Sequence, residues 1–152
     1  MRPTFRHEDW QQYVDINRPL ADAVIEEASR PDPIVLVHDY HFALLPRMVR
    51  ERLPRATILA FWHIPWPNAE TFSICPWREE IVYGLLGSTI LGFHTQFHCN
   101  NFLEGTDRFV ESRIDRESSS VTVGGGETMI RPSPISIEWP PAALAAQAPV
   151  PD

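Results

Sequence analysis

The sequence predicts a single α/β domain built on a doubly wound parallel sheet. Three apolar runs carry this prediction, at residues 34–37, 57–62 and 89–93. Each run is short, continuous and rich in β-branched or aromatic side chains, as expected for parallel strands buried on both faces. Segments with helical spacing lie between them, and alternating strands and helices indicate βαβ units. The length of 152 residues suits one domain.

Helical patterns surround the predicted strands. Residues 8–29 carry one apolar stripe, and Pro19 inside it predicts a kink or two shorter helices. A helix follows the first strand, and Pro46 fits it only in the first turn. Further helices are expected over 69–74, 77–87 and about 95–115.

The pattern changes after residue 117. Three glycines, Gly124–Gly126, separate two strand-like segments, which indicates a β-hairpin. A phosphate-binding loop is the alternative, but these glycines do not open a helix. Residues 134–137 indicate one more short strand, and the alternating charges of 108–117 are typical of a solvated helix face.

Composition and charge exclude several classes. The net charge is −7, and all basic residues are Arg, which argues against a nucleic-acid surface or an anionic membrane as partner. Residues 1–9 have no apolar signal-peptide core, and no run reaches the length of a membrane span. We therefore expect a cytoplasmic protein. Cys75 and Cys99 form no CxxC motif, which favours reduced thiols over a disulfide.

Chemically capable residues follow three consecutive predicted strands: Asp39, His63 and His94. In open parallel sheets, ligands bind beyond the carboxyl ends of the strands. Asp39 suits hydrogen bonding to sugar hydroxyls, although an Asp here also suits a helix N-cap. His63, between Trp62 and Trp66, suits a hydroxyl-rich ligand between aromatic walls. The alternative for His63 is a core histidine bonded to a backbone carbonyl. Position alone does not decide between a ligand-binding and a structural role for either Asp39 or His63.

A metal site would require the histidines to converge. Five of them have suggestive spacing: His38, His41, His63, His94 and His98. Real zinc sites bring a carboxylate or cysteines in a recognised arrangement, and neither HExxH nor paired cysteines are present. We therefore expect no metal and no other cofactor. A metal-dependent hydrolase that uses these histidines remains an alternative function.

Four ordered motifs resemble the trehalose-6-phosphate synthase family. They are VHDYHFALLP at 37–46, FWHIPWP at 61–67, PWREEI at 76–81 and LGFHT at 91–95. The resemblance extends over about residues 8–141. It implies a partial N-terminal, acceptor-side Rossmann-like domain of a GT-B glycosyltransferase over 1–141, with 142–152 as a disordered tail or linker remnant.

This resemblance implies transfer of glucose from UDP-glucose to glucose 6-phosphate, with retention of configuration and without a protein nucleophile. Asp39 matches the family aspartate that binds acceptor hydroxyls. His63 matches the histidine that contacts the donor glucose near the reacting centre, which makes it the expected catalytic and substrate-binding residue. Both roles are positional and electrostatic. The family often has Gln where His94 stands, so the resemblance gives His94 no role.

In the family, the basic residues that hold the diphosphate belong to a second domain. We expect that domain to be encoded separately, and the isolated chain to lack synthase activity. A non-catalytic interaction or regulatory module that keeps the fold is the alternative. The acceptor also stays open, because related enzymes use glycerol-phosphate-like or cyclitol-phosphate acceptors.

Overall fold

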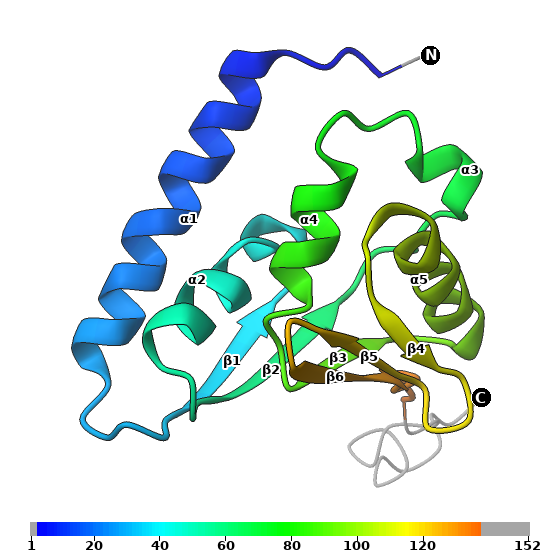
Figure 1. The fold of residues 1–152 in the computed structure, drawn as a ribbon. Coiled ribbons are helices and arrows are strands. Elements are labelled where there is room, and N and C mark those ends of the chain that lie inside the picture. The colour runs from blue at the N-terminus through cyan, green and yellow to red at the C-terminus, as the bar shows by residue number, and fades with distance from the viewer. Residues whose placement is uncertain (1–2, 138–152) are drawn as a thin grey trace, which may run out of the picture.

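The structure, a computed structural model, describes residues 3–137 as a six-stranded sheet with helices packed on it (Figure 1). The predicted boundary at residue 141 and the predicted tail at 142–152 lie outside the described residues. The elements in chain order are α1 (His7–Glu27), β1 (Ile34–His38), η1 (Tyr40–Phe42), α2 (Leu45–Arg52), β2 (Thr57–Trp62), α3 (Ala69–Phe72), α4 (Arg78–Leu85), β3 (Ile90–Phe93), α5 (Gln96–Phe109), β4 (Arg113–Asp115), β5 (Ser120–Val123) and β6 (Gly126–Pro132).

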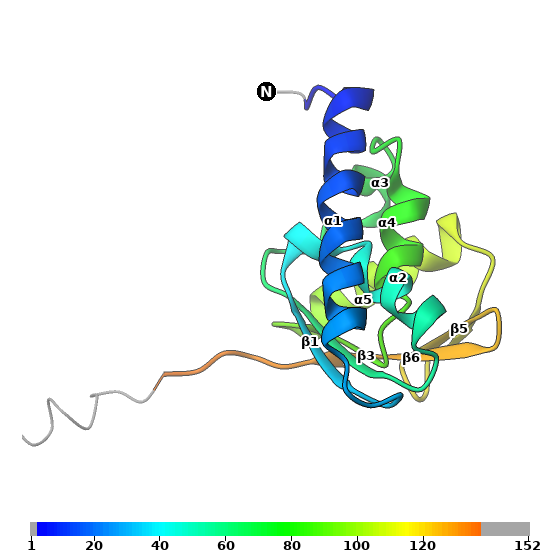
Figure 2. The same ribbon diagram turned by 90° about the vertical axis from the view of Figure 1, so that its left-hand side faces the viewer.

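The sheet has the order β1-β2-β3-β6-β5-β4, and its first four strands are parallel. From β1 to β6 this order advances in one direction, so right-handed crossovers place the connecting helices on one face. Figures 1 and 2 show the helices on a single side of the sheet. The predicted α/β class with a parallel sheet is confirmed. A doubly wound sheet has helices on both faces, and within residues 3–137 the helices cover one of them.

The core lies between this face of the sheet and the helices. In β1, Val35 and Val37 point into it, and the parallel register continues the layer through Ala60, Leu91 and Ile130. Each of these side chains is buried. Full burial of one large aliphatic or aromatic side chain contributes about 1.5–3 kcal/mol, so burial of this layer stabilises the domain.

The other face of β1 is open. Ile34 is 74% exposed and Leu36 is 66% exposed, because β1 is an edge strand and no described helix covers that side. The prediction that the run 34–37 is buried on both faces is therefore wrong. A continuous apolar run cannot distinguish a strand covered twice from one that leaves alternate side chains uncovered.

Helix α1 is continuous through Pro19, so the interpretation as two shorter helices is wrong. Asn17 and Ala21, on either side of the proline, are both buried against the domain. This packing keeps the helix together although proline removes one backbone donor. Pro46 lies in the first turn of α2, as predicted.

The C-terminal hairpin is confirmed. Strands β5 and β6 pair antiparallel, and the turn between them has Gly124 at φ 56° and Gly125 at φ 83°. Glycine adopts this left-handed region without steric cost.

Two predictions near the hairpin are wrong. Helix α5 ends at Phe109, and Arg113–Asp115 forms β4, antiparallel to β5, so the charged stretch 108–117 is not a helix face. Residues 133–137 form no strand. In both places cross-strand pairing, which depends on distant residues, decides the outcome.

Cys75 and Cys99 are both free thiols. Burial raises the pKa of the Cys99 thiol to about 11. Over residues 3–137, we find no helix that combines the length and the apolar character needed to cross a membrane.

Candidate functional site

The carboxyl ends of β1, β2 and β3 lie side by side. The register pairs His38 with Phe61 and Trp62 with Phe93, so the residues just beyond these strands share one edge of the sheet. The structure thereby brings Asp39, His63 and His94 together, as their positions in the sequence indicated.

Asp39 has an unusual backbone conformation, with φ 65° and ψ −179°. This region is populated almost only by glycine, and a non-glycine residue there costs about 1–3 kcal/mol. Its carboxylate Oδ1 accepts a hydrogen bond of 3.1 Å from the backbone N–H of His63. Asp39 precedes η1 but makes no side-chain capping bond to it, so the N-cap alternative is wrong. The carboxylate instead ties the end of β1 to the end of β2.

His63 is exposed, so the alternative of a buried core histidine is wrong. Its Nε2 lies 3.2 Å from Nδ1 of His38, within hydrogen-bond distance. The His94 ring lies 5.6 Å away, centroid to centroid. Imidazoles from three neighbouring strand ends therefore lie in sequence along this edge, with His63 between His38 and His94.

The expected aromatic walls of His63 lie elsewhere. Trp66 is 1% exposed and packs in the core against Phe93 and Phe102. Trp62 contacts Trp66 edge-on and belongs to the same helix-covered side. The expectation that both tryptophans flank the imidazole is wrong, because neighbouring residues at the end of a strand point to opposite sides.

Phe61 is the aromatic neighbour that the sequence analysis missed. Its ring centroid lies 4.7 Å from that of His63 and 5.0 Å from that of His94. A Cβ on Gly92 would approach Phe61 Cδ2 to 2.7 Å, so glycine at this position allows the ring to lie over β3. The sequence could have indicated this neighbour, because side chains alternate between the two faces of a strand and Phe61, two residues before His63, points to the same face.

Helix α1 holds the loop that follows Asp39. The Tyr13 hydroxyl accepts a 2.9 Å hydrogen bond from the Ala43 N–H and donates a 2.6 Å bond to the Tyr40 carbonyl. Burial raises the pKa of Tyr13, so the hydroxyl keeps the proton that it donates. The fully buried Asn17 donates to the carbonyls of His41 and Tyr13. These side chains position the loop from a helix distant in sequence.

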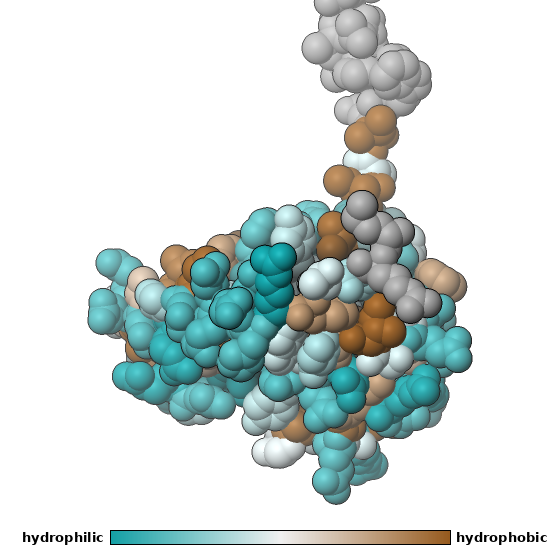
Figure 3. All heavy atoms as spheres, turned by 90° about the horizontal axis from the view of Figure 1, so that it is seen from above, coloured by the Kyte–Doolittle hydropathy of each residue, from teal (hydrophilic) through white to brown (hydrophobic). Residues whose placement is uncertain are grey.

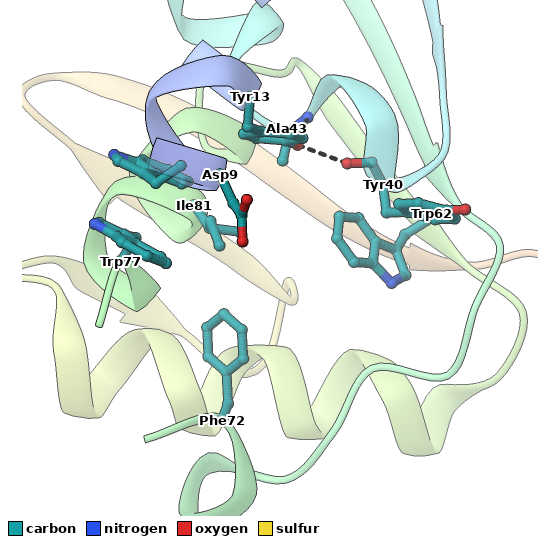
Figure 4. A pocket seen from close by; sticks show the side chains of 9 residues that line it. Asp9, Tyr13, Tyr40, Ala43, Trp62, Phe72, Trp77 and Ile81 are labelled. Carbon is teal, nitrogen blue, oxygen red and sulfur yellow. Dashed lines mark hydrogen bonds between the residues drawn. The ribbon is translucent and has the colours of Figure 1, made fainter. Parts of the chain in front are cut away.

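An aromatic pocket of about 370 Å³ lies on the helix side of the same strand ends. Figure 4 shows the carboxylate of Asp9 pointing into it, with Phe72 and Trp77 among its walls. It shares Tyr40 and Trp62 with the segments that carry Asp39 and His63. Its lining is Asp9, Trp10, Tyr13, Tyr40, Ala43, Trp62, Phe72, Trp77 and Ile81. The motifs at 37–46, 61–67 and 76–81 supply five of these residues, but the sequence analysis did not place them around a common pocket.

The five histidines do not converge on one point. The His41 ring stacks on Tyr40 at 4.1 Å, and Nδ1 of His98 lies 3.3 Å from the Trp66 carbonyl oxygen. Within the described part of the chain, no group of three or more His, Cys, Asp or Glu residues has the arrangement of a metal site. The geometry therefore offers a polar, hydrogen-bonding edge suited to hydroxyl groups.

Comparisons with known proteins agree with this geometry. The model of glycosyltransferase family 20 matches residues 1–149. A validamine 7-phosphate valienyltransferase of Streptomyces hygroscopicus subsp. jinggangensis is 39% identical over 84% of this chain and 27% of its own length. A trehalose-6-phosphate synthase of Mycobacterium ulcerans is 40% identical over 86% of this chain and 26% of its own length.

A solved structure described as "Trehalose-6-phosphate from E. coli bound with UDP-2-fluoro glucose" has a TM-score of 0.84 at 28% identity. It covers 97% of this chain and 32% of that one. The Rossmann-like α/β fold expected for part of a GT-B glycosyltransferase is confirmed by this similarity. The chain spans about a quarter of the length of the relatives it matches. The family model, the relatives and the shared fold together show that the chain belongs to glycosyltransferase family 20.

Proposed function

We propose that this chain forms the acceptor-side wall of a retaining glycosyltransferase site that transfers glucose from UDP-glucose to glucose 6-phosphate in trehalose biosynthesis. The observation that carries the proposal is the strained Asp39, whose carboxylate bonds the His63 N–H. Strain of this kind persists only where the surrounding structure enforces it, and it is concentrated at functional sites.

Asp39 orients the acceptor in this proposal. Its Oδ1 is occupied by the His63 N–H, whereas its second carboxylate oxygen bonds no residue within 3–137. That second oxygen accepts a hydrogen bond from an acceptor hydroxyl. Hydrogen bonds that involve an ionised group are stronger than neutral ones, so one carboxylate contributes both affinity and orientation.

His63 contacts the donor glucose near the reacting centre. Its exposed ring, supported by His38 and Phe61, is held in place before any ligand arrives. Positioning and preorganised dipoles can lower the barrier to glucosyl transfer without a covalent enzyme intermediate. We therefore propose His63 as the catalytic residue and both Asp39 and His63 as substrate-binding residues, with no metal or other cofactor.

The departing diphosphate requires cationic groups that this edge does not supply. Arg131, on β6 beside Gly92, already donates to the backbone carbonyls of Ser118 and Ile130. We propose that a separate C-terminal domain binds the diphosphate, and that the isolated chain binds the acceptor without turnover.

The names of two relatives support a phosphorylated acceptor. The Streptomyces relative is named for validamine 7-phosphate, and the Mycobacterium ulcerans relative for the synthesis of trehalose 6-phosphate. Glucose 6-phosphate is the acceptor that we propose, and a cyclitol phosphate is the alternative to include in the same experiment.

The test is titration of the isolated chain with glucose 6-phosphate, followed by NMR chemical shifts. We expect saturable binding that Asp39→Asn weakens by about tenfold or more, equivalent to 1.4 kcal/mol. Asp107→Asn is the matched control, because Asp107 is an exposed carboxylate on α5. Binding that is absent, or that is unaffected by Asp39→Asn, contradicts the proposal.

A second assay measures UDP release from UDP-glucose and glucose 6-phosphate. We expect the wild-type chain to release no more UDP than His63→Ala does, and turnover above that control contradicts the assignment of diphosphate binding to another domain. Adding the C-terminal half of a relative distinguishes the alternatives. If the chain is part of a glycosyltransferase, the mixture releases UDP. If the chain is a non-catalytic module, it continues to bind glucose 6-phosphate without turnover.

A further inference from the structure

Two successive residues at the end of β1, His38 and Asp39, hold His63 from different sides. The Asp39 carboxylate accepts a 3.1 Å hydrogen bond from the backbone N–H of His63. Nδ1 of His38 lies 3.2 Å from Nε2 of His63, and the planes of the two rings are inclined by 21°. The Phe61 ring lies against the same imidazole, with 4.7 Å between centroids. Both the backbone and the ring of His63 are therefore positioned by residues of β1 and β2.

The contact between the two ring nitrogens relates the tautomers of the two histidines. A neutral imidazole carries a proton on one nitrogen and leaves the other bare. A hydrogen bond between Nδ1 of His38 and Nε2 of His63 requires that one of these atoms is protonated and the other is bare. The bond that one ring nitrogen makes decides the state of the other nitrogen in the same ring. His38 therefore controls whether the remaining nitrogen of His63, Nδ1, donates or accepts a hydrogen bond.

Two arrangements satisfy this condition, and the chemistry of imidazole favours one of them. If His63 donates, both rings carry their proton on Nε2; if His38 donates, both rings carry it on Nδ1. A neutral histidine side chain without other partners carries its proton mainly on Nε2. No residue within 3–137 bonds Nε2 of His38 or Nδ1 of His63, so nothing in this part of the chain opposes that preference. The preferences of the two rings add, and they favour His63 as the donor.

The other nearby imidazoles do not compete with His38. The His94 ring meets the His63 ring at 64°, with 5.6 Å between centroids, and its Nδ1 is buried without a hydrogen-bond partner among residues 3–137. The His41 ring stacks on Tyr40 instead. Within the described residues, His38 is thus the histidine that bonds the His63 ring.

We propose that His38 is a positioning residue that fixes the tautomer of His63: the Nε2–H of His63 donates to Nδ1 of His38, and Nδ1 of His63 is left as a bare acceptor. This inference rests on the proposed function for its consequence. His63 is exposed, and its bare Nδ1 accepts a hydrogen bond from a hydroxyl of the donor glucose. The same atom cannot donate a hydrogen bond to an oxygen of the diphosphate. A lone pair held in place before the sugar binds costs no reorganisation during the transfer.

The test is nitrogen NMR of the whole chain, uniformly isotope-labelled, at about pH 9, which is above the range in which histidines ordinarily titrate. Correlations from the carbon-bound ring protons show which nitrogen of each imidazole carries the proton. We expect His63 and His38 each to be protonated on Nε2. We also expect a scalar coupling between Nε2 of His63 and Nδ1 of His38, because such a coupling arises only across a hydrogen bond.

Three variants separate the role of the acceptor from that of the ring. His38→Phe keeps a ring on the open face but removes the acceptor, so we expect the coupling to disappear and the ratio of the two His63 tautomers to fall by about threefold, within the effect of one typical hydrogen bond. His38→Asp offers an acceptor and no donor, and we expect it to restore the ratio. His41→Phe is the matched control, because His41 is an exposed histidine of the adjacent loop that stacks on Tyr40. An unchanged amide signal from the fully buried Ile130 shows that each variant is folded.

Several results would overturn the proposal. They are a His63 ring protonated on Nδ1, a wild-type chain without the coupling, and a tautomer ratio that His38→Phe leaves unchanged, that His41→Phe lowers equally or that His38→Asp does not restore. None of these measurements involves a ligand. They can fail while Asp39→Asn still weakens the binding of glucose 6-phosphate, which would leave the proposed function intact, and they can succeed where that titration fails.

Discussion

The two faces of the sheet differ in how far their side chains are exposed, although neighbouring residues of the same strand point to opposite faces. Val37 is 5% exposed and Leu36, one residue earlier, is 66% exposed. The covered face packs tightly against the helices, whereas the open face ends in His38, Phe61 and His63. One set of alternate residues packs in the core, and the other set lies on the open face.

The surface above the helices differs again from the open sheet face. Seen from that side, it is mainly hydrophilic, with hydrophobic side chains in separate patches (Figure 3). The exposed apolar side chains of β1, Ile34 and Leu36, instead lie together on the open face of the sheet. Substitutions should therefore separate stability from binding according to the face on which they lie.

The largest expected effect is loss of the core ring in Phe93→Ala. Phe93 is fully buried and contacts Trp66 and Phe102, so its truncation should cost about 3–5 kcal/mol. Leu36→Ala, on the open face, should change the free energy of unfolding of the monomer by about 0.5 kcal/mol or less. Urea denaturation at dilute protein concentration measures both, and similar costs would contradict the distinction between the faces.

Tyr13→Phe should have an intermediate effect. It removes the donor to the Tyr40 carbonyl and leaves the Ala43 N–H without its acceptor, so we expect a loss of about 1–3 kcal/mol. Tyr83→Phe is the control, because Tyr83 is 42% exposed. Thermal unfolding of the two variants compares them, and equal stability would show that the clamp on the loop contributes little.

The smallest effect should distinguish glycine from alanine at Asp39. Both variants lose the hydrogen bond to the His63 N–H, but only glycine adopts φ 65° with this ψ without strain. Asp39→Gly should therefore be more stable than Asp39→Ala by about 1 kcal/mol. At Asp107, inside α5, the order should reverse, because glycine is the poorer helix former. Denaturant midpoints of the four variants test this, and the same order at both positions would argue against strain at Asp39.

Much of the fold could be predicted because it depends on local patterns. Pro46 in a first turn and Gly124–Gly125 between two strands are signals that neighbouring residues complete. Strand β4 could not be predicted in this way, because Arg113–Asp115 is defined by its pairing with β5. The exposure of Ile34 and Leu36 depends on what covers the sheet, which no local pattern records.

The candidate site was predictable in position but not in detail. The ends of consecutive parallel strands meet, so Asp39, His63 and His94 were expected together. The tryptophan walls were wrong because the side alternates at each residue, and Phe61 was the ring on the correct side. The roles of Asp39 and His63 in binding and transfer stay predictions, and the titration of Asp39→Asn tests the role of Asp39 in acceptor binding.

The hydrogen bond from the His63 N–H to Asp39 has a thermodynamic consequence for the two-substrate site that we propose. A ligand that reorients the Asp39 carboxylate alters the environment of His63, and the reverse holds equally. Energetic coupling between two sites is reciprocal, so any factor by which an acceptor at Asp39 strengthens donor binding must be returned by the donor to the acceptor. A short link between two strand ends can thus favour the ternary complex over either binary one.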